Sequence, residues 1–126
     1  MTNQPLNILA FAAHPDDVEL AASGTLIQHI AQGHRCGIID LTRGELGSRG
    51  SAEDRDNEAS ASSKILGLSA RENLNLGDGF FEINDATLMA VIKMIRKYQP
   101  QIVLANAVSD RHPDHGKGAQ LAIDAC

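Results

Sequence analysis

Short apolar runs alternate with helical patterns along the whole chain, and this alternation restricts the fold more than any other feature. The segment LNILAFAA at 6–13 is almost wholly apolar, which is typical of a strand buried on both faces of a sheet. The next segment, 17–33, places apolar residues at helical spacing and ends at Gly33. Strands that alternate with helices predict a parallel sheet covered by helices on both faces.

The same alternation continues to the end of the chain. We expect the remaining strands over 35–42, 72–76 and 101–106. We expect the remaining helices over 51–67, over 85–99 and from His115 or Gly116 onward. The resulting order, β-α-β-α-β-α-β-α, predicts an α/β fold with a Rossmann-like parallel sheet of strand order 3-2-1-4.

The length of 126 residues is that of one ordinary domain. The last helical pattern, GKGAQLAIDAC, stops without a cap or a glycine. We therefore interpret 1–126 as a single, C-terminally incomplete domain, the N-terminal portion of a longer one.

Composition excludes several classes of partner. The formal net charge is −5 and no basic block occurs, which argues against nucleic acid. No apolar stretch approaches the length of a membrane span, and the N-terminus lacks the basic region of a signal peptide. The two cysteines, Cys36 and Cys126, lie far apart, which favours a reducing compartment over a disulfide framework. We expect a cytoplasmic protein that acts on a small molecule.

Two His-Pro-Asp tripeptides carry the most chemistry. AHPDDVEL follows the first predicted strand and RHPDHGKG follows the fourth, and each tripeptide is followed by one more ligand-type residue, Asp17 or His115. In the order 3-2-1-4 the first and fourth strands are neighbours, and a ligand crevice opens at their carboxyl ends. The topology therefore predicts that the two motifs face each other.

These loops supply three imidazoles and three carboxylates, namely His14, Asp16, Asp17, His112, Asp114 and His115. Two histidines and one aspartate with an open fourth position suit a catalytic Zn²⁺ or a similar divalent ion. Hydrolysis also needs a carboxylate base and an acid for the leaving group. The alternative is that the aspartates only form turns and cap helices, but two such loops on neighbouring strands favour a shared metal or acid/base site.

Three motifs in this order resemble one known family. AHPDD, LTRGELGSRG and RHPDH are similar to the LmbE-like (PIG-L) zinc-dependent de-N-acetylases, and the resemblance covers essentially the whole chain. AHPDDVEL together with TRGELGSRG most resembles the branch that deacetylates N-acetylglucosaminyl malate in bacillithiol biosynthesis. The resemblance implies one Zn²⁺ per chain, with another divalent ion left open, an amino-sugar conjugate as substrate, and a homo-oligomer as one assembly state.

The resemblance also implies roles for the six motif residues. His14, Asp17 and His115 would be the metal ligands, and Asp16 would be the general base. His112 would be the acid, oriented by Asp114. Members of the family are usually longer than this chain.

Outside the motifs, we expect substrate contacts from Glu45, Arg49 and Arg111. Arg49 could hold an anionic group of the substrate through a bidentate contact, or it could pair with a nearby glutamate. Other polar residues have simpler interpretations: Asp78 and Asp110 are turn residues, and His29 and His34 lie on the surface.

The lead hypothesis is a zinc-dependent deacetylase of an N-acetylglucosamine conjugate. A metal phosphoesterase is the alternative enzyme, because His and Asp clusters at strand ends also serve phosphate chemistry. A sugar-binding fragment without catalysis is the third hypothesis.

Overall fold

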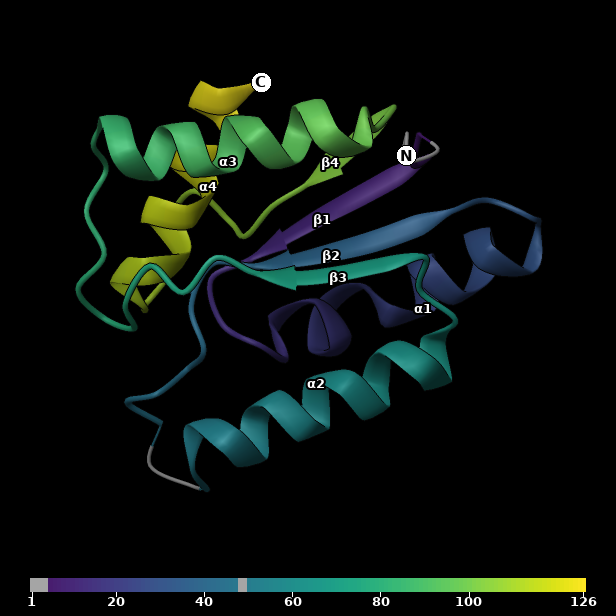
Figure 1. Cartoon of the computed structure of the whole chain (residues 1–126), viewed down its shortest axis with the longest axis horizontal. Helices are drawn as coiled ribbons and strands as arrows, with labels where there is room; N and C mark the ends of the chain where they lie inside the picture. Colours follow the sequence, from purple (N-terminus) through teal and green to yellow (C-terminus); the bar gives the residue numbers. More distant parts are fainter. Residues whose placement is uncertain (1–4, 48–49) are drawn as a thin grey trace.

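The computed structural model describes residues 5–47 and 50–126, in which strands and helices alternate (Figure 1). The elements are β1 (Ile8–Ala12), α1 (Asp17–Ala31), β2 (Cys36–Asp40), α2 (Ala52–Leu66), β3 (Ala70–Asn73), α3 (Asp85–Tyr98), β4 (Ile102–Leu104) and α4 (Pro113–Ala125). None of these helices is both long and apolar enough to cross a membrane.

The strands form one parallel sheet of order β3-β2-β1-β4, which confirms the predicted topology. β1 is central, with β2 paired along its whole length and β4 paired along its first three residues. The strand order reverses between β1 and β4, so the loops that leave these two strands diverge to opposite faces of the sheet.

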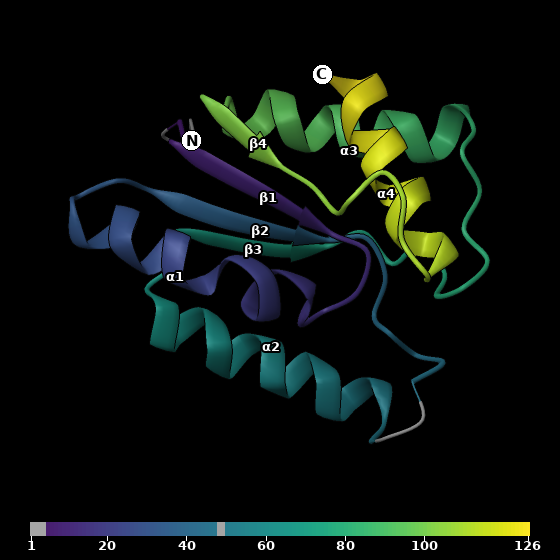
Figure 2. The ribbon, with the colours of Figure 1, turned by 180° about the vertical axis from the view of Figure 1, so that it is seen from behind.

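Helices cover both faces of the sheet (Figure 1, Figure 2): α1 and α2 lie on one face, and α3 and α4 on the other. β1 supplies side chains to both layers, as the period of two in a strand requires. Leu9 and Phe11 pack in the cluster beneath α3 and α4, whereas Ile8 and Ala10 pack in the cluster beneath α1. The aromatic members of the two clusters, two phenylalanines and one tyrosine, all lie on the α3–α4 side.

Most predicted elements differ from the structure by one or two residues at their ends, and two differences have a clear physical reason. The third strand was expected over 72–76, whereas β3 covers Ala70–Asn73. Leu74 and Leu76 do pack against the core, but Asn75 between them has a φ of 53°, which interrupts the extended conformation. The last helix begins at Pro113 rather than near His115, because proline is well suited to the first helical position.

Candidate functional site

The first His-Pro-Asp motif turns the chain sharply from β1 into α1. Asp16 has φ 124° and ψ −20°, a conformation that residues other than glycine rarely adopt and that is common at functional sites. The carboxylate of Asp17 turns back and accepts a hydrogen bond from the His14 backbone amide at 2.9 Å. As a result the two adjacent carboxylates diverge, with Asp17 partly buried and Asp16 exposed.

The second motif forms the start of α4. The ring nitrogen Nδ1 of His112 accepts a hydrogen bond from the Asp114 backbone amide at 3.1 Å, and His112 is the N-cap of the helix. Asp114, which could have capped this helix, is instead fully buried and directed into the site.

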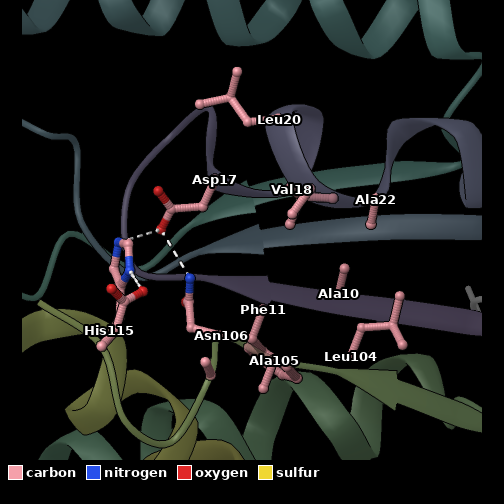
Figure 3. A pocket seen from close by; sticks show the side chains of 13 residues that line it. Ala10, Phe11, Asp17, Val18, Leu20, Ala22, Leu104, Ala105, Asn106 and His115 are labelled. Carbon is pink, nitrogen blue, oxygen red and sulfur yellow. Dashed lines mark hydrogen bonds and ion pairs between the residues drawn. The ribbon is translucent and has the colours of Figure 1, made fainter. Parts of the chain in front are cut away.

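The loops bring His14, Asp17 and His115 together, as the topology predicts. One nitrogen from each histidine and one oxygen of Asp17 all lie within 4.8 Å of one another. His14 Nδ1 is 3.7 Å and His115 Nε2 is 3.4 Å from Asp17 Oδ2. Figure 3 shows His115 and Asn106 both directed at the Asp17 carboxylate, to which Asn106 Nδ2 donates at 3.2 Å.

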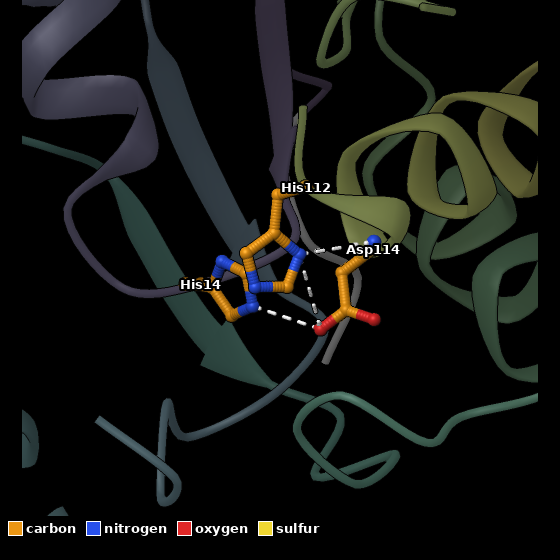
Figure 4. A group of neighbouring side chains, drawn as sticks. All are labelled: His14, His112 and Asp114. Carbon is orange, nitrogen blue, oxygen red and sulfur yellow. Dashed lines mark hydrogen bonds and ion pairs between the residues drawn. The ribbon is translucent and has the colours of Figure 1, made fainter. Parts of the chain in front are cut away.

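A second group forms on the other nitrogen of His14. His14 Nε2 lies 2.9 Å from Asp114 Oδ2 and 3.0 Å from Asp78 Oδ1, and the His112 ring meets the His14 ring edge-on (Figure 4). His112 Nδ1 is 3.9 Å from the Asp114 carboxylate. Asp114 therefore contacts His112 through its backbone amide, whereas its carboxylate holds His14.

Three carboxylates, those of Asp17, Asp78 and Asp114, surround His14. Burial lowers the pKa of His14, but hydrogen bonds and charges from Asp17 and Asp114, together with the charge of Asp78, outweigh this and raise it to about 9. Burial raises the pKa of Asp17, yet the histidine contacts prevail and the pKa is lowered overall. Within residues 5–47 and 50–126, no lysine or arginine forms an ion pair with any of these three carboxylates.

The donor set fits a divalent ion. Two imidazole nitrogens and one carboxylate oxygen are a common protein ligand set for catalytic zinc. Asp114 Oδ1 is also buried without a hydrogen-bond partner among the described residues, so the surrounding negative charge is not fully compensated. His14, Asp17 and His115 are thus able to hold such an ion.

His14 also lines a cavity of about 250 Å³ together with Asp16, His112 and Arg55. The Arg55 guanidinium lies over the glycine-rich loop: a Cβ atom on Gly44 would come within 2.7 Å of its Nη1. The charge of Arg55 opposes a rise in the pKa of Asp16, but burial and the neighbouring Asp17 raise that pKa overall. A second, mainly apolar cavity of about 370 Å³ lies between α1 and β4 and reaches Asp17 and His115 (Figure 3).

The predicted substrate contacts lie as follows. Glu45 is exposed, and its Oε2 accepts a hydrogen bond from the Asp78 amide at 3.0 Å. Arg111 is exposed beside His112, and its backbone amide donates to Asp110 Oδ1 at 2.6 Å. Arg49 lies outside the described residues.

The sequence interpretation missed four residues of the site: Asn106, Asp78, Asp110 and Arg55. Asp78 and Asp110 were expected to be turn residues, although each contacts a histidine of the ligand group. Their position along the chain could have identified them, because both lie in loops that follow strands at the same end of the sheet as the two motifs. Arg55 on α2 gave no local signal.

His29 and His34 lie outside this site. Their Nδ1 atoms are 3.0 Å apart and their rings stack at the end of α1.

The parallel sheet and the site define an α/β protein with a group of metal-ligand type at the point where the strand order reverses. The sequence profile of the PIG-L family, described as GlcNAc-PI de-N-acetylase, matches residues 9–126. The chain belongs to this family.

Known relatives differ in their reactions. The chain is 32% identical to the uncharacterized deacetylase YaiS of Escherichia coli K12, over 98% of this chain and 70% of YaiS. It is 28% identical to 4-oxalmesaconate hydratase of Pseudomonas putida KT2440, over 99% of this chain and 53% of the hydratase. Relatives of this chain thus include one named as a deacetylase and one named as a hydratase, at similar identities.

Solved structures share the fold. The conserved protein TT1542 of Thermus thermophilus has a TM-score of 0.90 and 42% identity over 95% of this chain and 55% of its own. N,N'-diacetylchitobiose deacetylase of Pyrococcus horikoshii has a TM-score of 0.86 and 26% identity over 94% of this chain and 48% of its own. The chain thus spans about half the length of these proteins.

Proposed function

We propose that the protein is a metal-dependent N-deacetylase that removes the acetyl group from an acetamido sugar. The observation that carries the proposal is the convergence of His14, Asp17 and His115, with the exposed Asp16 carboxylate directly beside them. The description of the family as de-N-acetylases supports it, as does the likeness to YaiS and to N,N'-diacetylchitobiose deacetylase.

The chain supplies ligands and proton-transfer groups. His14, Asp17 and His115 would hold a divalent ion, Zn²⁺ in the first instance, and such an ion supplies Lewis acidity for amide hydrolysis. The diverging Asp16 carboxylate lines the cavity, where it accepts a proton from the attacking water. His112 lines the same cavity and donates a proton to the amine nitrogen as the C–N bond breaks. The products are acetate and the free amino sugar.

We further propose an anionic conjugate, N-acetylglucosaminyl malate of bacillithiol biosynthesis, as the substrate. Arg55 supports this, because its guanidinium lies in the same cavity as Asp16 and His112 and can take a carboxylate through paired hydrogen bonds. Arg49 and Arg111 remain further candidates for the same anion.

A single ion fits the site better than the two ions of many phosphoesterases. The two groups of potential ligands share His14. Its Nε2 faces two carboxylates and so carries a proton, which leaves Nδ1 as the one ligand atom. A hydratase is the second candidate, because one relative is named as such and addition of water also needs a positioned base.

Acetate release from N-acetylglucosaminyl malate tests the proposal, with Zn²⁺ added and after removal of metal by a chelator. We expect release that depends on zinc and is slower for N-acetylglucosamine, which lacks the malyl carboxylates. Zinc-loaded protein that releases no acetate from either compound would overturn the deacetylase, and turnover that survives the chelator would overturn its metal dependence. Hydration of 4-oxalmesaconate, followed by ultraviolet absorbance, serves as the comparison reaction.

A further inference from the structure

Each histidine of the ligand group has a carboxylate on the nitrogen that points away from Asp17. His115 Nδ1 lies 2.7 Å from Asp110 Oδ2, and its Nε2 faces Asp17. His14 Nε2 lies 3.0 Å from Asp78 Oδ1, and its Nδ1 faces Asp17. The two contacts are alike although different loops supply the carboxylates, β4–α4 for Asp110 and β3–α3 for Asp78.

These contacts determine where the protons sit. A carboxylate only accepts hydrogen bonds, so the nitrogen that faces it must carry hydrogen. In a neutral imidazole the other nitrogen then has the lone pair. His14 Nδ1 and His115 Nε2 would thus direct lone pairs at the Asp17 oxygen, only 3.7 Å and 3.4 Å away. A metal-bound imidazole is neutral, so a bound ion would take the place of any hydrogen on the two nitrogens that face Asp17.

Asp78 is also part of a link between two loops. Its Oδ2 accepts a hydrogen bond from the Leu46 amide at 2.8 Å, and its own amide donates to Glu45 Oε2 at 3.0 Å. The next amide, that of Gly79, donates to Asp114 Oδ2 at 2.8 Å. Asp78 therefore joins the glycine-rich loop after β2 to the His14 imidazole, and its side chain is only 7% exposed.

We propose that Asp78 and Asp110 are positioning residues that fix the tautomers of His14 and His115, so that both imidazoles present a lone pair to one divalent ion beside Asp17. The proposal rests on the proposed metal site and assigns a task to two residues that otherwise look like turn formers. Asp114 assists at His14 Nε2, and Asp78 in addition joins that nitrogen to the glycine-rich loop through the Leu46 amide.

The first test measures the affinity of the chain for Zn²⁺ by competition with a chromophoric chelator. Loss of a carboxylate behind a ligand histidine weakens metal binding by roughly 10–100-fold, and we expect this for Asp110→Ala and Asp78→Ala. Asp110→Asn keeps an acceptor for the Nδ1 hydrogen and should recover part of the loss. Asp124→Ala, which removes an exposed carboxylate on the same helix as His115, is the matched control and should bind as the unchanged chain does.

The second test reads the tautomers directly. In the zinc-loaded chain, ¹⁵N NMR of the imidazoles should show hydrogen on Nε2 of His14 and on Nδ1 of His115. In zinc-loaded Asp110→Ala we expect the His115 Nδ1 hydrogen, which has lost its acceptor, to exchange faster with water, while the Nε2 hydrogen of His14 exchanges as in the unchanged chain. Circular dichroism and urea unfolding show whether each variant is folded, so a weaker affinity is not mistaken for unfolding.

The outcomes separate this inference from the proposed function. Unchanged zinc affinity in folded Asp78→Ala and Asp110→Ala, or the opposite tautomers, would overturn the positioning roles even if the chain releases acetate. Weakened zinc affinity in a chain that releases no acetate would support the positioning roles and overturn the deacetylase instead.

Discussion

Two charged clusters lie at the same end of the sheet and are built in opposite ways. We call Asp40, Arg71 and Glu19 the closed cluster, and His14, Asp17 and His115 the open cluster. In the closed cluster the Arg71 guanidinium donates to both Asp40 oxygens at 2.8 and 3.0 Å and to Glu19 Oε2 at 2.8 Å. In the open cluster three ligand atoms converge, and within the described residues no guanidinium or ammonium group pairs with Asp17.

The two clusters differ in whether they contain a guanidinium group that pairs with their carboxylates. A buried charge is costly unless it is paired and hydrogen-bonded, and Arg71 provides such a pairing for Asp40, whose side chain is 2% exposed. Among the described residues, the carboxylates around His14 have imidazoles and no guanidinium or ammonium group as ion-pair partners, and an imidazole gives up its positive charge when it binds a metal. A cluster that needs a cation from outside is suited to binding one, whereas a cluster that holds its own guanidinium group is suited to joining elements together.

The first prediction sets activity against stability within the site. Asp16→Asn removes the proposed base and keeps a residue that tolerates a positive φ. Loss of a general base lowers turnover by about 10²–10⁴-fold, and we expect a loss of that size in acetate release with zinc affinity unchanged. Because Asp16 is exposed, urea unfolding should give the same free energy as for the unchanged chain.

An Asp16→Asn chain that keeps full acetate release would remove Asp16 from the mechanism. A chain destabilised by the change would instead show that Asp16, beside the open cluster, has a structural role.

The sequence predicts the open cluster better than the closed one. The two motifs could be placed together because they follow two strands whose adjacency the βα pattern implies, and the family resemblance then selected His14, Asp17 and His115 among their residues. The sheet order follows from the same pattern, since parallel strands and right-handed crossovers leave few topologies.

The closed cluster gave no such signal. Asp40 lies in an apolar strand, Arg71 in a weak strand whose start was misplaced, and Glu19 in the first turn of a helix. Only the register, which sets Ile38 beside Arg71 and Asp40 beside Asn73, brings the guanidinium to the Asp40 carboxylate. The positions of Asp78 and Asp110 relative to the histidine rings depend in the same way on loop conformations that sequence patterns do not specify.

The second prediction breaks the closed cluster. Arg71→Met leaves Asp40 and Glu19 buried without their cation, and loss of one partner of a buried ion pair costs about 3–5 kcal/mol. We expect a loss of that order in the free energy of unfolding measured in urea near neutral pH. Arg71→Lys keeps a positive charge but not the paired geometry, so it should lose less and remains measurable if the methionine variant does not fold.

The loss should depend on pH. Burial raises the pKa of Asp40 to about 6, although the hydrogen bonds and charge of Arg71 oppose that rise. Without Arg71 the pKa of Asp40 rises further above its unfolded value, and a raised folded pKa gives stability that is lost as pH increases through it. Unfolding at acid and at alkaline pH should therefore show the smaller deficit on the acid side. A deficit that is equal at both would mean that Asp40 is not the group left uncompensated.

The last prediction tests whether an ion pair must be buried, and not only close, to stabilise the fold. Arg43 and Asp56 approach within 2.5 Å, but their side chains are 39% and 42% exposed. Water solvates both charges when the pair is broken, and surface pairs contribute little to stability. We therefore expect Asp56→Asn to leave the urea midpoint unchanged within error, both at low salt and at high salt. If Asp56→Asn proved as destabilising as Arg71→Lys, a close ion pair would stabilise the fold whether or not it is buried. Burial would then no longer explain the contribution of Arg71 to stability.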